Sequence, residues 1–239
     1  MGTLGLCNDS GRQRQSRFSL PHPPISLAIF LTLEEAMRVT WNRIHDESRP
    51  PFNPVTAQEA AFTAEMEEVL RDELLEEESV DGFSKEFFHD IVRPEVKNFD
   101  GKKVSKRPDL LVKMVGRQNV KPTQDGIFVE CKLIDTDATS KRLYCDNGIT
   151  RFTDGDYAWA MTEAMMLAYS REKKKPSVAL TDAFEKRKNK VLPVGKLRDC
   201  SESSAKPVVA ISMHRRTFPL NGRRAPKITL RHLWLQRPS

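Results

Sequence analysis

The chain has 239 residues, of which 38% are hydrophobic and 30% are charged, a balance typical of a globular protein with a substantial core. Its longest apolar run, 25–33, has 9 residues, whereas about 20 are needed to cross a bilayer, so no membrane span is expected. Four scattered cysteines without a CxxC pair or a zinc spacing argue against a disulfide framework and favour a reducing, cytoplasmic setting.

Charge is unevenly distributed along the chain. Residues 1–140 hold 18 Lys and Arg against 24 Asp and Glu, a net charge of −6, whereas residues 141–239 hold 21 against 9, a net charge of +12. A basic segment attracts nucleic acid because its side chains displace counterions from phosphate groups. The alternative is a solvated basic surface that has no partner.

The N-terminal part is expected to contain a disordered segment and then two helices. Residues 1–24 are rich in Ser, Arg, Gln, Gly and Pro and lack periodicity, which predicts disorder. Residues 25–239 contain no long linker and are expected to form a single domain. The apolar run 25–33 leads into a predicted helix over 33–44, and an amphipathic helix is predicted over 57–77.

The predicted helix over 57–77 has one apolar face. Its apolar residues recur at i, i+4, i+7, i+8 and i+12, and they are Phe62, Met66, Val69, Leu70 and Leu74. Thr56 and Glu59 have the spacing of a capping box at the start of this helix. Glu59 also lies near the centre of the apolar face, where a charged side chain is unusual. Two interpretations of Glu59 are therefore open, namely a helix cap and a residue of a functional site. Glu65, Glu67 and Glu68 lie off that face.

The spacing of the hydrophobic residues changes after this helix, from a helical period to short apolar runs. Residues 86–92 fit a short helical turn or a strand. Residues 108–114 and 127–134 are apolar and predict two strands, and the polar, Pro-containing loop 116–126 between them predicts a hairpin.

The C-terminal half is expected to alternate helices and strands. Residues 135–155 are interpreted as a loop, and helices are predicted over 156–170 and 181–189. Two final strands are predicted over 208–213 and 228–235. The order of elements predicts a mixed α/β (α+β) domain.

Two acids and a lysine are expected to meet where the predicted hairpin strands pair. Side chains at i and i+2 of a strand point to the same face, so Glu130 and Lys132 face one way and Cys131 faces the other. If the strands are antiparallel, Asp109 at the start of the first lies beside the end of the second. Carboxylates in such a cluster suit Mg²⁺, which prefers oxygen ligands and contacts phosphate, and a lysine beside them can orient water.

Pro108-Asp109 followed by Glu130-Cys131-Lys132 resembles the signature of the PD-(D/E)xK, restriction-endonuclease-like nucleases. The resemblance implies a mixed β-sheet flanked by helices and a metal-dependent endonuclease acting on DNA, and by extension a role in defence against foreign DNA. It implies Asp109, Glu130 and the Cys131 carbonyl as ligands of Mg²⁺ (Mn²⁺ being an alternative) and Lys132 as the catalytic lysine. The family often adds an acid from the preceding helix, which would make Glu59 catalytic.

Further residues are candidates for nucleic-acid contact. The segment 148–157 resembles one found in uncharacterised bacterial restriction-like proteins, and its Arg151 is a candidate for phosphate contact, whereas its aromatic residues are expected in the core. Lys173, Lys174 and Lys175 are candidates for contact with the nucleic-acid backbone. DNA is the expected polymer, with RNA an alternative, and the family resemblance leaves a homodimer open.

Two other functions remain as alternatives. One is a non-catalytic nucleic-acid-binding protein that keeps the same fold, against which the intact acids and lysine argue. The other is a protein-partner-binding module whose acidic helix docks a basic protein, for which replacing Asp109 would affect nothing beyond stability.

Overall fold

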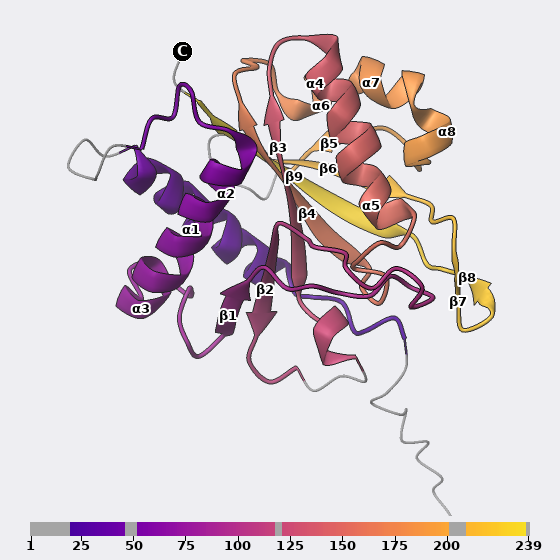
Figure 1. Ribbon diagram of the computed structural model, residues 1–239, viewed down its shortest axis with the longest axis horizontal. Helices are drawn as coiled ribbons and strands as arrows, with labels where there is room; N and C mark the ends of the chain where they lie inside the picture. The colour runs from indigo at the N-terminus through magenta and orange to yellow at the C-terminus, as the bar shows by residue number, and fades with distance from the viewer. Residues whose placement is uncertain (1–19, 46–51, 118–120, 201–208, 238–239) are drawn as a thin grey trace, which may run out of the picture.

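The computed structural model describes residues 20–45, 52–117, 121–200 and 209–237, and at its centre lies a mixed β-sheet of seven strands (Figure 1). The strands follow the order β1-β2-β3-β4-β9-β6-β5 across the sheet. Their bounds, with those of a separate β7–β8 hairpin, are Phe88–Val92 (β1), Leu110–Met114 (β2), Ile127–Ile134 (β3), Glu163–Ser170 (β4), Arg198–Asp199 (β5), Ala210–His214 (β6), Pro219–Leu220 (β7), Arg223–Arg224 (β8) and Ile228–Gln236 (β9).

The middle of the sheet is parallel and its two sides are antiparallel. β4 runs parallel to both β3 and β9, whereas β1, β2 and β3 pair antiparallel, as do β9, β6 and β5. The predicted hairpin is confirmed, because Leu110 pairs with Val129 and Val112 with Ile127 in antiparallel register. The mixed α/β class and the helix-flanked sheet are confirmed as well.

Helices cover both faces of the sheet (Figure 1). One layer holds α1, α2, α3 and the π-helical segment η1, and the other holds α4 to α8 with the π-helical segment η3. Their bounds, with those of a 3₁₀ turn η2 between β2 and β3, are Leu27–Ile44 (α1), Glu59–Glu68 (α2), Val69–Leu74 (η1), Leu75–Glu77 (α3), Pro122–Gln124 (η2), Ala138–Leu143 (α4), Tyr144–Ile149 (η3), Thr150–Thr153 (α5), Pro176–Ala179 (α6), Thr181–Lys186 (α7) and Lys188–Val191 (α8).

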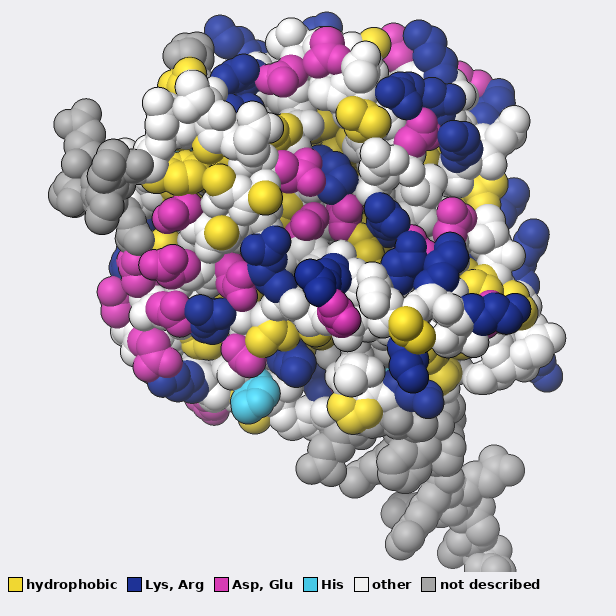
Figure 2. All heavy atoms as spheres, viewed as in Figure 1, with side chains coloured by type: hydrophobic (Ala, Val, Ile, Leu, Met, Phe, Trp, Pro, Cys, Tyr) yellow, Lys and Arg dark blue, Asp and Glu magenta, His cyan; other side chains and the backbone are white. Residues whose placement is uncertain are grey.

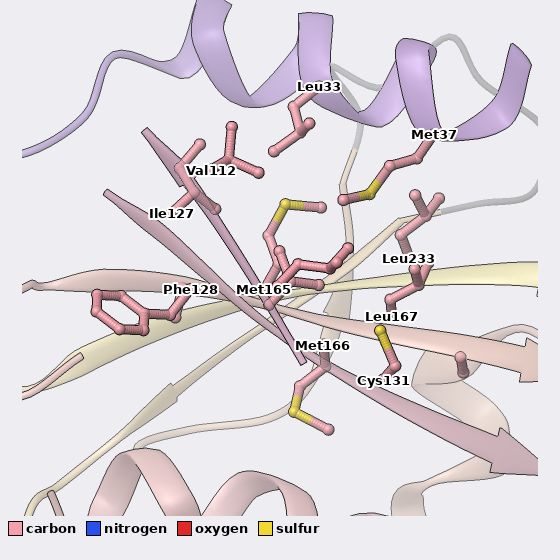
Figure 3. Packing of buried hydrophobic residues seen from close by; sticks show 14 of the residues in the cluster. Leu33, Met37, Val112, Ile127, Phe128, Cys131, Met165, Met166, Leu167 and Leu233 are labelled. Atoms are coloured by element: carbon pink, nitrogen blue, oxygen red, sulfur yellow. The ribbon is translucent and has the colours of Figure 1, made fainter. Parts of the chain in front are cut away.

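The main hydrophobic core lies on both sides of the sheet. Figure 3 shows Leu33 and Met37 of α1 pointing toward the strands and Met166 of β4 pointing to the opposite face. On that opposite face, a Cβ added to Gly148 of η3 would lie 2.6 Å from Met166 Cε. The absence of a side chain at Gly148 therefore lets η3 pack closely on the sheet.

The prediction of a helix over 156–170 is wrong, because residues 163–170 form strand β4. Apolar residues in this segment recur at helical spacing, but every residue after Glu163 in the strand is buried. A parallel strand that is covered on both faces has no polar positions and no period of two. Hydrophobic pattern alone therefore does not separate such a strand from a buried helix.

The prediction of a loop over 135–155 is also wrong, because α4, η3 and α5 lie within it. The Asp137 carboxylate caps α4 by accepting hydrogen bonds from the backbone N–H groups of Thr139 and Ser140. This segment is polar on its outer face and contains a glycine, which hides a helix from composition-based reasoning.

Other elements lie close to their predicted positions. α1 begins at Leu27, ahead of the predicted 33, because Ser26 Oγ accepts a hydrogen bond from the Ile29 N–H and starts the helix there. The helix predicted over 57–77 extends from Glu59 to Glu77, with π-helical geometry in its middle. The segment 86–92 contains a strand, and the helix predicted over 181–189 is divided into α7 and α8.

Residues 20–24 contact the body of the protein. The His22 N–H donates to the Ala160 carbonyl at 2.7 Å, and Arg117 Nη2 donates to the Pro23 carbonyl at 2.7 Å. The rest of the segment predicted to be disordered, 1–19, lies outside the described residues. Within the described part of the chain, no helix is long and apolar enough to cross a membrane.

Candidate active site

Asp109 lies directly before β2 and faces the next strand of the sheet. Because β2 and β3 are antiparallel and Leu110 pairs with Val129, the residue before Leu110 reaches the segment that follows Val129. Asp109 Oδ2 accepts a hydrogen bond from the Cys131 N–H at 2.7 Å. This contact fixes the carboxylate beside the ExK segment, as the predicted strand pairing requires.

Glu130 and Lys132 lie on the same face of β3, as the two-residue period of a strand demands. Lys132 Nζ is 2.8 Å from Glu130 Oε1 and 3.7 Å from Asp109 Oδ2. It also donates to the Cys131 carbonyl at 2.6 Å, whereas the Cys131 side chain is fully buried in the core. One ammonium group therefore gathers two carboxylates and a carbonyl oxygen.

Glu59 joins this cluster from α2. Its Oε1 is 3.0 Å from Lys132 Nζ, and its Oε2 accepts a hydrogen bond from the Leu133 N–H at 3.1 Å. The capping-box interpretation is wrong, because the N-cap of α2 is Gln58 and no side chain caps it. Glu59 lies on the buried side of the helix and uses both carboxylate oxygens to bind β3.

Tyr157 is a site residue, although the sequence interpretation favoured a core position for it over a role of its hydroxyl as a donor. Its ring stacks on Phe128 at a centroid distance of 6.1 Å and lies edge-on to Phe152, so the expected core packing is present. Its hydroxyl also donates to Glu130 Oε2. Glu130 thus binds Tyr157 through one oxygen and Lys132 through the other, which fixes its orientation.

Burial dominates the acid–base behaviour of the cluster. Burial raises the pKa of Glu130 to about 8, with Lys132 opposing the rise and Asp109 adding to it. Burial also raises the pKa of Asp109, again against Lys132. For Lys132, burial acts to lower the pKa, but Glu130, Asp109 and Glu59 outweigh it and raise the pKa overall. Buried carboxyl groups of this kind become fully ionised when more positive charge lies beside them.

A second cluster of charges adjoins the first. The carboxylate of Asp156, in the turn before β4, is 3.0 Å from Arg151 Nη1, 2.9 Å from Lys106 Nζ and 3.5 Å from Lys103 Nζ. Burial acts to raise the pKa of Asp156, but hydrogen bonds from Lys106 and Arg151 outweigh it and lower the pKa. Because three cations share one carboxylate, this cluster has a net positive charge.

Three of the catalytic candidates, Glu59, Glu130 and Lys132, line an open depression of about 600 Å³ between α2, β3, α4 and α5, whereas Asp109 lies behind them and is not a lining residue. Figure 2 shows acidic and basic side chains side by side in this region. The lining residues include Glu59, Glu130, Lys132 and Arg151, with polar residues of α4 and η3 around them. The structure thus brings Arg151 to the rim of the same depression as the acids.

The lysines 173–175 lie elsewhere. None of the three lines the depression. Lys174 lines a different cavity beyond α4, and Lys175 Nζ is 3.4 Å from Asp199 Oδ2. Their contact with nucleic acid stays a prediction, and it would involve a surface apart from the acidic cluster.

The oxygen atoms of the cluster suit a hard divalent cation. In the described part of the chain there is no group of three or more His, Cys, Asp and Glu residues arranged to hold a metal ion. Mg²⁺ commonly needs fewer, since one or two carboxylates hold it while water and substrate phosphate complete its shell. Asp109, Glu130 and the Cys131 carbonyl already surround the Lys132 ammonium, so their donor chemistry fits Mg²⁺ or Mn²⁺.

Comparison with known proteins gives no matching family model and no similar curated protein. The resemblance to PD-(D/E)xK nucleases therefore rests on residues 108–109 and 130–132 and on the geometry described above.

Proposed function

We propose that the protein is a Mg²⁺-dependent endonuclease that hydrolyses DNA phosphodiester bonds. The observation that carries this proposal is the convergence of carboxylates from three separate elements on Lys132 Nζ, with Asp109, Glu130 and Glu59 all within 3.7 Å. Acids and a lysine on an ordinary surface strand pair would be solvated. Here the Glu130 residue is 5% exposed, and burying charges in this way is costly unless they have a function or a compensating partner.

The metal would be held by Asp109, Glu130 and the Cys131 carbonyl. When bound, Mg²⁺ stabilises the charge that develops on phosphoryl oxygens and lowers the pKa of a coordinated water. The Lys132 ammonium lies among these groups, where it can orient a water molecule and offset negative charge. Glu59 holds Lys132 from the side of α2, and the Tyr157 hydroxyl holds Glu130.

The proposed substrate is DNA, because cations border the acidic cluster. Arg151, Lys106 and Lys103 share the Asp156 carboxylate, and the Arg151 side chain is 40% exposed at the rim of the depression. Guanidinium and ammonium groups bind phosphate oxygens without reading the base sequence. This arrangement favours contact with the backbone of a strand that reaches Asp109 and Glu130.

Cleavage of plasmid and linear DNA in Mg²⁺ tests the proposal. Wild-type protein should cut, EDTA should abolish cutting, and Asp109→Asn, Lys132→Ala and Glu59→Gln should each slow it by about 100-fold or more. Asp109→Asn keeps an oxygen that can accept the Cys131 N–H, so the strand contact survives. Glu68→Gln is the matched control, because Glu68 lies exposed on the same helix as Glu59.

Other results would favour other functions. Equal cutting by wild type and the three site variants would contradict the proposal. A wild type that binds DNA but does not cut any substrate would favour the non-catalytic nucleic-acid-binding function. A wild type that neither binds nor cuts nucleic acid would favour the partner-binding module, and an RNA substrate run in parallel decides between the two polymers.

A further inference from the structure

A second cavity, of about 450 Å³, lies between α4 and the pair α6–α7. Lys141 and Arg142 of α4 line this cavity, whereas Ser140 and Leu143 of the same helix line the active-site depression. At 3.6 residues per turn these two pairs project from opposite sides of the helix. The cavities are therefore separate, and α4 forms a wall of both.

The cavity combines an apolar surface with a cationic rim. The apolar part is contributed by small aliphatic side chains, which are Ala138, Val178, Ala179 and Ala183. The cations come from α4, α7 and the chain around them, and they are Lys141, Arg142, Lys174, Lys186 and Arg187. Figure 2 shows Lys and Arg side chains gathered over α4, α7 and α8, the region that contains this cavity.

Part of this positive charge is neutralised within the protein and part is available. Lys141 binds Glu172 at 2.6 Å, and Arg142 and Arg187 both approach the Asp146 carboxylate, at 3.4 and 3.5 Å. Among the described residues, no carboxylate lies within ion-pair distance of the ammonium groups of Lys174 and Lys186. Within the described part of the chain, those two ammonium groups are therefore available to an anion, with the charge of Lys174 also acting on Glu172 at longer range.

The net charge of the site supports anion binding. Five cations line the cavity against one lining carboxylate, Asp182. With Glu172 and Asp146 behind them, and with Lys190, which also approaches Asp146 at 3.5 Å, the balance is six positive charges against three negative. A phosphomonoester carries close to two negative charges at neutral pH and three acceptor oxygens, and the positive excess is large enough to balance that charge.

We propose that the cavity binds a phosphomonoester with an apolar body, of the class represented by a nucleoside monophosphate. The phosphate lies on Lys174 and Lys186, and the flat, apolar part of the ligand lies on Val178, Ala179 and Ala183. The cavity has the size of a small-molecule site. The same chemistry is offered by a free nucleotide and by the 5′-phosphate at the end of a nucleic-acid strand.

Binding of a fluorescent N-methylanthraniloyl-AMP, followed by anisotropy with full-length protein, tests this site. Measurements use the Asp109→Asn background in EDTA, so that neither cleavage nor a metal at the first site contributes. Lys174→Ala and Lys186→Ala should each weaken binding by about tenfold, the loss expected for one charge-assisted contact. Lys188→Ala is the matched control, since Lys188 lies on the adjacent α8, is 59% exposed and does not line the cavity.

A second arm distinguishes the two sources of phosphate. Oligonucleotides that carry a 5′-phosphate and identical ones with a 5′-hydroxyl are titrated against the same variants. Nucleotide binding that falls in the two lysine variants and not in the control supports a free nucleotide as ligand. No nucleotide binding, with a preference for the 5′-phosphate that the same variants lose, supports a strand end as the source. Absence of both effects, or equal effects in Lys188→Ala, overturns the proposal and leaves a solvated basic surface.

Discussion

Tyr157 is the residue on which the orientation of Glu130 depends. Its hydroxyl donates to Glu130 Oε2, and its ring is buried against Phe128 and Phe152. Removing the hydroxyl leaves ring packing in place but leaves one oxygen of a buried carboxylate without its donor. A hydrogen bond to a charged group typically contributes about 1.5–3 kcal/mol.

Tyr157→Phe should therefore lower DNA cleavage by about tenfold, because Glu130 is no longer held in its orientation. Circular dichroism and the unfolding midpoint show whether the fold is retained. Tyr169→Phe is a control of the same chemistry, since Tyr169 is buried on β4 and its hydroxyl lies beside the side chains of Thr63 and Cys131 and not beside Glu130. Full activity of Tyr157→Phe would contradict a positioning role.

The individual site residues differ in how well the sequence predicts them. Asp109, Glu130 and Lys132 are brought together by strand alternation and by the pairing of consecutive strands, which are local properties. The contact of Tyr157 with Glu130 joins residues 27 apart, and that of Glu59 with Lys132 joins residues 73 apart. Such contacts depend on how whole elements pack, so the position of Glu59 on the apolar face makes it a candidate but does not specify its partner.

At the scale of secondary structure elements, the turn between α5 and β4 constrains the site because it carries Asp156 and Tyr157. Gly155 in this turn has φ +72°, and a Cβ there would lie 2.7 Å from Phe218 and 2.9 Å from Phe99. Gly116 has a similar φ of +76°, and no atom of the described residues lies within 4 Å of an added Cβ there. Comparing substitutions of the two glycines therefore separates the stability lost through backbone conformation from the stability lost through overpacking.

Gly155→Ala should lower the free energy of unfolding by about 1–3 kcal/mol more than Gly116→Ala, because aromatic rings have little room to move. Both variants share the cost of an L-residue at positive φ. Urea unfolding of the two proteins measures the difference. Equal losses would show that the Phe218–Phe99 pair yields to the added methyl group.

Elements were predictable where they have a clear period or are bounded by polar loops. The helix beginning at Glu59 shows a helical period, and the two apolar runs of the β2–β3 hairpin are separated by a polar loop. β4 is covered on both faces and therefore lacks a period. The helix α4, which lines both cavities, lies in a segment that was interpreted as a loop, so the second cavity had no counterpart in the sequence interpretation.

At the scale of the whole molecule, a buried chain of hydrogen bonds joins the helical layer to the sheet. Tyr144 Oη lies 2.8 Å from His232 Nδ1, Ser212 Oγ lies 2.6 Å from Nε2 of both His232 and His214, and His214 Nδ1 lies 2.5 Å from the Val191 carbonyl. A carbonyl can accept but not donate, so His214 carries its proton on Nδ1. One proton per group then satisfies every link when both imidazoles are neutral.

The contribution of this network to stability should therefore fall as pH decreases. Burial lowers the pKa of His214 to about 4. The pKa of His232 is lowered to about 3 by burial and by the neighbouring His214. In the unfolded chain both histidines are protonated near their ordinary pKa, whereas in the folded protein they stay neutral to a lower pH. Their contribution is thus fully present above about pH 6.5 and is lost toward pH 4 and pH 3, at up to about 1.4 kcal/mol per pH unit for each.

Urea unfolding between pH 7 and pH 4 measures this dependence. His214→Gln should reduce the slope by about one proton, whereas His89→Gln should leave it unchanged, because His89 is exposed. Comparison of the variant with the wild type also removes the opposing contributions of Glu130, Asp109 and Glu34, whose pKa values are raised by burial. An identical slope in His214→Gln would contradict the neutral buried network.

Direct binding of Mn²⁺, followed by electron paramagnetic resonance, tests the central claim that Asp109 and Glu130 hold a divalent cation. Wild-type protein should show saturable binding, and Asp109→Asn and Glu130→Gln should each weaken it by about tenfold or more, because a charged oxygen ligand is lost. Glu68→Gln should bind as the wild type does. No Mn²⁺ binding by the wild type, or equal binding by the two site variants, would contradict the claim.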